Sequence, residues 1–137
     1  MSEKAKISKN NKYWIPEEAY HCARHYARRY KEFLDEHDYL IDTLTGVSYD
    51  SQPHGSGISK PTEGAAIRAS IIMSKVQLIE KMATEVTKKE PAMYRYILKG
   101  VTEKVNYGNL RDSGMPCSRE KYQNMKREFY WRLAREI

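Results

Sequence analysis

The sequence of 137 residues is poor in the features that disulfide-rich, metal-binding and membrane-spanning proteins require. It has two cysteines, Cys22 and Cys117, which are far apart and match no disulfide or zinc-ligand spacing. No apolar run approaches the roughly 20 residues that a membrane-spanning helix needs, and the mean hydropathy is −0.80. The N-terminal residues contain no apolar stretch typical of a secretory signal. These absences predict a protein of a reducing cytosol that makes no contact with a membrane.

Glycine and proline are also scarce, with seven and five residues, and aromatic residues make up only 11% of the chain. This composition is unlike that of a β-sandwich or a low-complexity segment. Apolar residues instead recur at steps of three and four through most of the sequence, which is the period of an amphipathic helix. The sequence therefore predicts an all-α fold.

Basic residues outnumber acidic ones by 24 to 18, and their placement is uneven. Residues 1–14 carry a net charge of +3 and are predicted to form a flexible basic arm. Residues 15–44 carry −3, and the segment from Cys117 to the C-terminus carries +3. The surplus at the two ends favours an anionic partner without proving one.

Two long helices are expected in residues 15–90. The first begins at Pro16, which suits a first helical turn, and ends at Gly46. A Gly-, Pro- and Ser-rich loop is predicted over 45–61, and a second helix begins with Thr62 as its N-cap. The two helices are expected to form an antiparallel hairpin used for assembly. Three residues widen the apolar stripe of the second helix and predict an interface of a homo-oligomer: Ile67, Ile71 and Leu78.

Residues 91–137 have the layout of a helix-turn-helix region. Pro91 opens a short helix that is predicted to stop at Gly100, and a short helical segment follows over 105–112. A tight turn over 113–116 leads to Ser118, the expected N-cap of a final helix that extends over 119–137. Five residues of this helix are expected to face inward: Tyr122, Met125, Phe129, Leu133 and Ile137.

The outward face of the final helix carries side chains that suit double-stranded DNA. It is predicted to present Glu120, Gln123, Asn124, Arg127 and Trp131. Gln and Asn can pair with adenine edges and Arg with guanine edges in a major groove, and long cations on the flanks can contact phosphates. The predicted DNA-binding residues are Ser118, Arg119, Lys121, Gln123, Asn124, Lys126 and Arg127. An ordinary amphipathic helix with a solvated charged face is the competing interpretation.

Three segments resemble the ArpU/RinA family of small phage transcriptional regulators, whose C-terminal part is similar to region 4 of sigma factors. The first is the mid-chain Gly-rich loop that leads into Pro61-Thr62-Glu63-Gly64-Ala65-Ala66-Ile67. The second covers residues 93–101, and the third covers residues 115–120 followed by 126–133. The resemblance covers roughly residues 15–137. It implies an all-helical protein that binds a phage promoter and controls late or packaging genes. We expect an activator that acts with RNA polymerase in the host bacterial cytosol, with a repressor as the alternative. The resemblance also implies a recognition helix over 118–136, in which Lys121, Gln123 and Asn124 stand where the family has more arginine.

No catalytic residue, metal ligand or cofactor site is predicted. His21 and His25 lie one helical turn apart, but the residues around them do not follow the pattern of a zinc helix. An enzyme is therefore the least favoured class of protein. Two alternatives to a regulator remain, namely a DNA-packaging assembly protein of the small-terminase kind and a protein-binding inhibitor module.

Overall fold

The computed structural model describes residues 11–49 and 59–137, and for 45–49 and 59–62 it describes only the helical backbone. The protein is all-α, as predicted, with no strand among these residues. Its helices are α1 (Glu17–Arg28), α2 (Tyr30–Tyr49), α3 (Ser59–Val86), the 3₁₀ turn η2 (Pro91–Met93), α4 (Tyr94–Thr102), α5 (Tyr107–Asp112) and α6 (Arg119–Ala134). No helix of the described residues is long and apolar enough to cross a membrane.

The chain divides into two compact units. One contains Met1–Arg29 and Leu78–Ile137, described from residue 11 onward, and the other contains Tyr30–Gln77. This division differs from the boundary predicted after residue 90, because α1 and the end of α3 group with the C-terminal helices. The predicted basic arm over 1–14 lies outside the described residues except for its last four.

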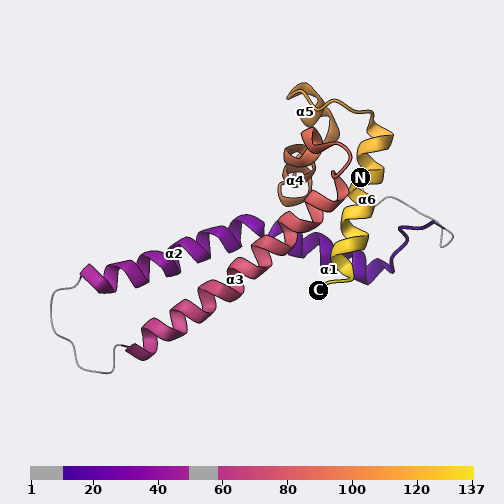
Figure 1. Ribbon diagram of the computed structural model, residues 1–137. Helices are drawn as coiled ribbons and strands as arrows, with labels where there is room; N and C mark the ends of the chain where they lie inside the picture. The colour runs from indigo at the N-terminus through magenta and orange to yellow at the C-terminus, as the bar shows by residue number, and fades with distance from the viewer. Residues whose placement is uncertain (1–10, 50–58) are drawn as a thin grey trace. The chain divides into compact units, whose positions relative to one another are not determined.

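The first unit is built around α6, which packs against both α1 and α4 (Figure 1). Tyr20 of α1 meets Tyr130 of α6 edge to face, with ring centroids 5.3 Å apart. Phe129 and Leu133 are fully buried, and burial of such a side chain stabilises a fold by about 1.5–3 kcal/mol. The middle and end of α6 are therefore packed against both α1 and α4.

The second unit pairs α2 with the first part of α3, and the two helices lie side by side in Figure 1. Phe33 and Leu40 of α2 are buried, as are Ala69, Ile72 and Val76 of α3. The Lys75 ammonium lies 5.5 Å from the centre of the Phe33 ring. Among the side chains of this unit that the structure describes, four large apolar ones are exposed: Tyr39, Ile41, Ile67 and Ile71.

The prediction of one long helix from Pro16 to Gly46 is wrong in two respects. This helix is interrupted at Arg29, whose backbone N–H bonds to the Tyr26 carbonyl at 3.1 Å, three residues back instead of four. No glycine or proline marks this break in the sequence. The helix also does not end at Gly46, because α2 continues to Tyr49. Glycine disfavours a helix by only about 1 kcal/mol relative to alanine, which the surrounding helical residues offset.

The predicted loop over 45–61 is shorter in the structure. Its first five residues belong to α2, and α3 begins at Ser59, so Thr62 lies inside α3 and is not its N-cap. The remainder of the predicted loop lies outside the described residues.

Gly100 does not end a helix either, because it is buried inside α4. A β-carbon at this position would overlap the Tyr122 hydroxyl oxygen and lie 3.1 Å from Tyr122 Cζ. Glycine is therefore needed here for the close approach of α4 and α6.

Candidate nucleic-acid interface

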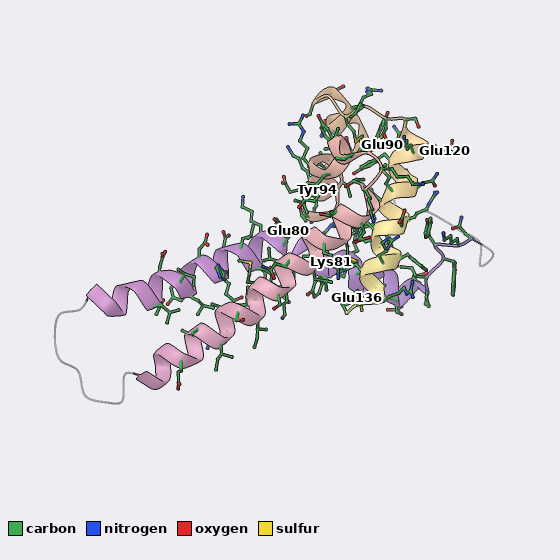
Figure 2. All side chains as sticks on the ribbon, in the orientation of Figure 1. Glu80, Lys81, Glu90, Tyr94, Glu120 and Glu136 are labelled. Atoms are coloured by element: carbon green, nitrogen blue, oxygen red, sulfur yellow. The ribbon has the colours of Figure 1, made fainter. Side chains whose placement is uncertain are left out.

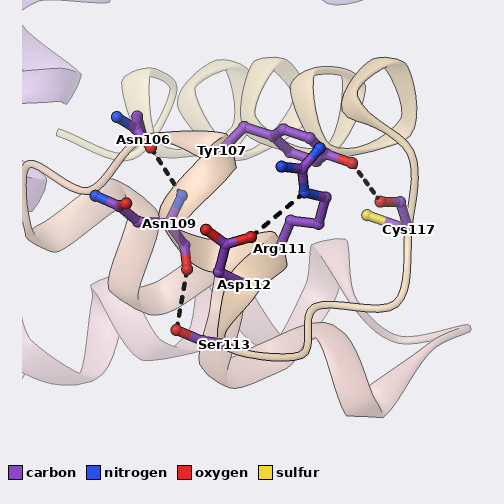
Figure 3. Close-up of polar contacts among 7 residues, drawn as sticks. All are labelled: Asn106, Tyr107, Asn109, Arg111, Asp112, Ser113 and Cys117. Atoms are coloured by element: carbon purple, nitrogen blue, oxygen red, sulfur yellow. Dashed lines mark hydrogen bonds and ion pairs between the residues drawn. The ribbon is translucent and has the colours of Figure 1, made fainter.

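The segment from α5 to α6 is shaped by local side-chain caps and one glycine. The Asn106 carboxamide oxygen accepts a 2.8 Å hydrogen bond from the Asn109 backbone N–H at the start of α5 (Figure 3). Gly114 has a φ of +107°, a conformation that L side chains rarely adopt. The Ser118 hydroxyl then accepts a 3.2 Å bond from the Lys121 N–H and caps α6, as predicted. The turn and the cap together fix the direction in which α6 leaves the turn.

The predicted inward face of α6 is largely confirmed. Tyr122, Phe129 and Leu133 are each at most 1% exposed. Met125 is half-buried and Ile137 is exposed, because α6 ends at Ala134. Tyr130 is buried as well, although the sequence interpretation left it off this face.

The predicted contact residues at the start of α6 remain accessible. Arg119, Lys121 and Asn124 are exposed, and Gln123 is half-buried. The Lys121 ammonium forms an ion pair with the carboxylate of Glu90, a residue that Figure 2 labels. This pair partly neutralises a cation that was expected to contact phosphate.

Lys126 is only 5% exposed, so its predicted place on the exposed flank of α6 is wrong. Its ammonium lies 5.4 Å from the centre of the buried Tyr122 ring. Residue 126 follows residue 122 by one helical turn and therefore shares its inward face. The long aliphatic stem of lysine can lie along such apolar surface.

Arg127 and Trp131 are also less available for contact with DNA than the sequence predicts. An Arg127 terminal nitrogen donates a 2.6 Å hydrogen bond to the Asn124 side-chain oxygen. Arg127 Nε is buried and finds no hydrogen-bond partner among the described residues. Trp131 is half-buried and meets Tyr13 edge to face at 5.4 Å. The outward face of α6 is thus open at its first two turns and increasingly covered beyond them.

Sequence reasoning missed a cluster of arginine and tyrosine side chains around the Gly114 turn. The Arg119 guanidinium lies 4.9 Å from the centre of the Tyr107 ring, and that of Arg111 lies 5.9 Å from the same centre. Arg95 lies 4.7 Å from the Tyr96 ring centre and donates a 2.6 Å bond to its hydroxyl oxygen. The spacing of Tyr107 and Arg111, which are four apart in one helix, is the sequence signal from which part of this cluster could have been found.

A groove of mixed charge runs beside the same helix. Its volume is about 490 Å³, and its lining includes four cations and three carboxylates. The cations are Lys88, Lys89, Lys121 and Arg132, and the carboxylates are Glu85, Glu90 and Glu128. Because positive and negative charges nearly balance, this groove is a poor binding site for a polyanion.

Burial and nearby charges shift the pKa values of Cys117 and Tyr94, which both belong to the first unit. Burial raises the pKa of the Cys117 thiol, an effect that Lys121 opposes and Glu90 reinforces. Burial, together with the Glu80 carboxylate, raises the pKa of Tyr94. Neither group sits in an arrangement that activates a nucleophile.

The histidine pair of α1 forms a stack and not a ligand set. The rings of His21 and His25 have centroids 6.4 Å apart, and His21 Nε2 lies 3.8 Å from a Glu17 carboxylate oxygen. Within residues 11–49 and 59–137, no group of three or more His, Cys, Asp or Glu side chains could hold a metal ion.

Comparison with known proteins adds no assignment to this geometry. No family model, no curated protein and no solved structure matches the chain.

Proposed function

We propose that this protein is a sequence-specific, double-stranded-DNA-binding transcriptional regulator in which α5, the Gly114 turn and α6 act as a helix-turn-helix. One observation carries the proposal. The start of α6, capped by Ser118, presents Arg119, Gln123 and Asn124 at or near the surface while its later turns are packed. Recognition helices of this class contact base edges with their N-terminal residues.

The chemistry of these side chains supports reading of a major groove. Gln123 and Asn124 offer the paired donor and acceptor that match an adenine edge. Arg119 supplies a cation for phosphate at the same end of the helix. Arg127 can reach a base only by releasing its hydrogen bond to Asn124.

The biological role proposed here rests on the resemblance to the ArpU/RinA family. In this role the protein acts in a bacterial host cytosol, binds a phage or prophage promoter and activates late or packaging genes with RNA polymerase. We also propose that the protein is a homo-oligomer. Ile67 and Ile71, which are 61% and 53% exposed one helical turn apart on α3, support this.

The test is fluorescence anisotropy with a duplex taken from the DNA upstream of the protein's own gene. A shuffled duplex of equal composition serves as the competitor, and each is titrated over a series of salt concentrations. Replacement of Gln123 or Asn124 by alanine is expected to cost about 1–3 kcal/mol on the specific duplex and little on the shuffled one. Gln77→Ala, on an exposed glutamine of the other unit, is the matched control.

Two results would contradict the regulator. Equal binding of both duplexes, combined with a large closed ring by light scattering, would favour a packaging assembly protein. Absence of binding to any duplex would leave a protein-binding module as the better proposal.

A further inference from the structure

We propose that Tyr107, Arg111 and Arg119 form a binding site for the phosphodiester backbone of duplex DNA, beside the base-reading start of α6. The inference rests on the proposed function and deepens it. It places one strand of the DNA against α5, although sequence analysis assigned no contact to that helix.

The site depends on a ring that is fixed in place. The Tyr107 hydroxyl donates a 3.0 Å hydrogen bond to the Cys117 carbonyl oxygen (Figure 3). Its ring also contacts that of Tyr122, with centroids 5.9 Å apart, and Tyr122 is 1% exposed. Tyr107 is therefore anchored to both the turn and the core.

Both guanidinium groups lie against this ring, and each comes from a different helix. Arg111 follows Tyr107 by four residues in α5, and Figure 3 shows its side chain beside the ring. Arg119 is the first residue of α6 and is brought to the ring by the Gly114 turn. Stacking on an aromatic face engages the plane of a guanidinium and leaves its in-plane N–H donors available.

Those donors suit phosphate better than they suit a base. A guanidinium fork matches two oxygens of one phosphate group, and the Arg111 side chain is 62% exposed. Arg111, Arg119 and Tyr122 already contact the Tyr107 ring, so a nucleobase would have to compete with them for it. The arrangement therefore favours the backbone of a duplex over the unstacked bases of a single strand.

One carboxylate competes for this site. Asp112 Oδ1 lies 3.6 Å from Arg111 Nε (Figure 3), and its side chain is 72% exposed. A bound phosphate would replace this ion pair. Removal of the Asp112 charge is therefore expected to tighten binding.

The experiment measures the slope of log affinity against log salt for the upstream duplex. Each phosphate contact contributes about −0.9 to this slope, so Arg111→Ala and Arg119→Ala are each expected to make it less negative by about one. Arg68→Ala, which removes an exposed arginine of the other unit, is the charge-matched control and is expected to leave the slope unchanged. Asp112→Asn is expected to tighten binding to every duplex.

Two further variants separate geometry from charge. Arg111→Lys keeps the positive charge but not the planar guanidinium fork. We therefore expect this variant to have the salt slope of the wild-type protein but a lower affinity for the duplex. Tyr107→Leu removes the ring at constant charge and is expected to weaken duplex binding. Circular dichroism establishes that this variant is folded, and Arg111→Ala tests the site without removing the ring.

The outcomes distinguish this inference from the proposal on which it rests. If the wild-type protein binds no duplex, both are overturned. If it binds the duplex but Arg111→Ala and Arg68→Ala give equal slopes, only the backbone site is overturned. An effect of Arg111→Ala confined to a single strand of the same length would also overturn it.

Discussion

Substitution of Gly100 by alanine tests the closest approach between α4 and α6. In an unhindered helix this change stabilises by about 1 kcal/mol, because alanine has the higher helix propensity. At Gly100 the new methyl group would overlap the Tyr122 hydroxyl oxygen. Tyr122 is 1% exposed and cannot swing into solvent without leaving the core. Overpacking of this kind costs about 1–3 kcal/mol, which exceeds the gain in helix propensity over most of its range, so we expect a net destabilisation of up to about 2 kcal/mol.

Urea unfolding followed by tryptophan fluorescence measures this change. Both tryptophans, Trp14 and Trp131, belong to the same unit as Gly100. Gly108→Ala is the matched control in that unit, because its β-carbon would meet only the Asn106 side-chain oxygen, at 3.4 Å. This control is expected to be neutral or slightly stabilising.

A second substitution shows whether the hydroxyl is responsible. Combination of Gly100→Ala with Tyr122→Phe removes the overlapping oxygen, so the cost of Gly100→Ala should fall by half or more in that background. A stabilised Gly100→Ala protein, or a cost unchanged by Tyr122→Phe, would refute the packing described for α4 and α6.

Three further predictions concern the turn. Gly114→Ala should destabilise the protein by about 1 kcal/mol or more, because Gly114 has a positive φ; urea unfolding would show this, and an unchanged midpoint would contradict the turn geometry. Ser118→Ala should cost about 1 kcal/mol in the same assay through loss of the α6 cap, whereas Ser118→Asp should retain stability. The third prediction uses a Cys22→Ser protein, in which Cys117 is the cysteine that can be alkylated. Burial raises the pKa of the Cys117 thiol and only the thiolate reacts, so alkylation should need a higher pH in the folded chain than in urea. Coincident pH profiles for the two states would be inconsistent with that burial.

Local sequence signals predicted the parts of the fold that depend on local interactions. The Ser118 cap, the Gly114 turn and the apolar period of α6 are each encoded within a few residues, and each is present in the structure. The break after α1 has no such signal, because Arg29 is an ordinary helix-compatible residue. Its position depends on packing that periodicity alone does not describe.

Some of the residues that were placed wrongly have environments that depend on the packing of helices against one another. Gly100 looks like a helix stop by itself, and only the approach of Tyr122 explains why it is buried within α4. Lys126 was placed outside because of its charge, although its register with Tyr122 puts it on the packed face. Arg111 lies beside the ring of Tyr107 within α5 itself, but Arg119 reaches this ring only after the turn has formed, so the complete cluster is a tertiary feature.

The contact between α1 and α6 joins segments near opposite ends of the sequence. A growing polypeptide that has passed residue 102 already contains α1 and α4 but still lacks the helix that both pack against. On the ribosome, the first unit can therefore close only after α6 has left the exit tunnel. Until then, the apolar faces of α1 and α4 remain uncovered and open to chaperones.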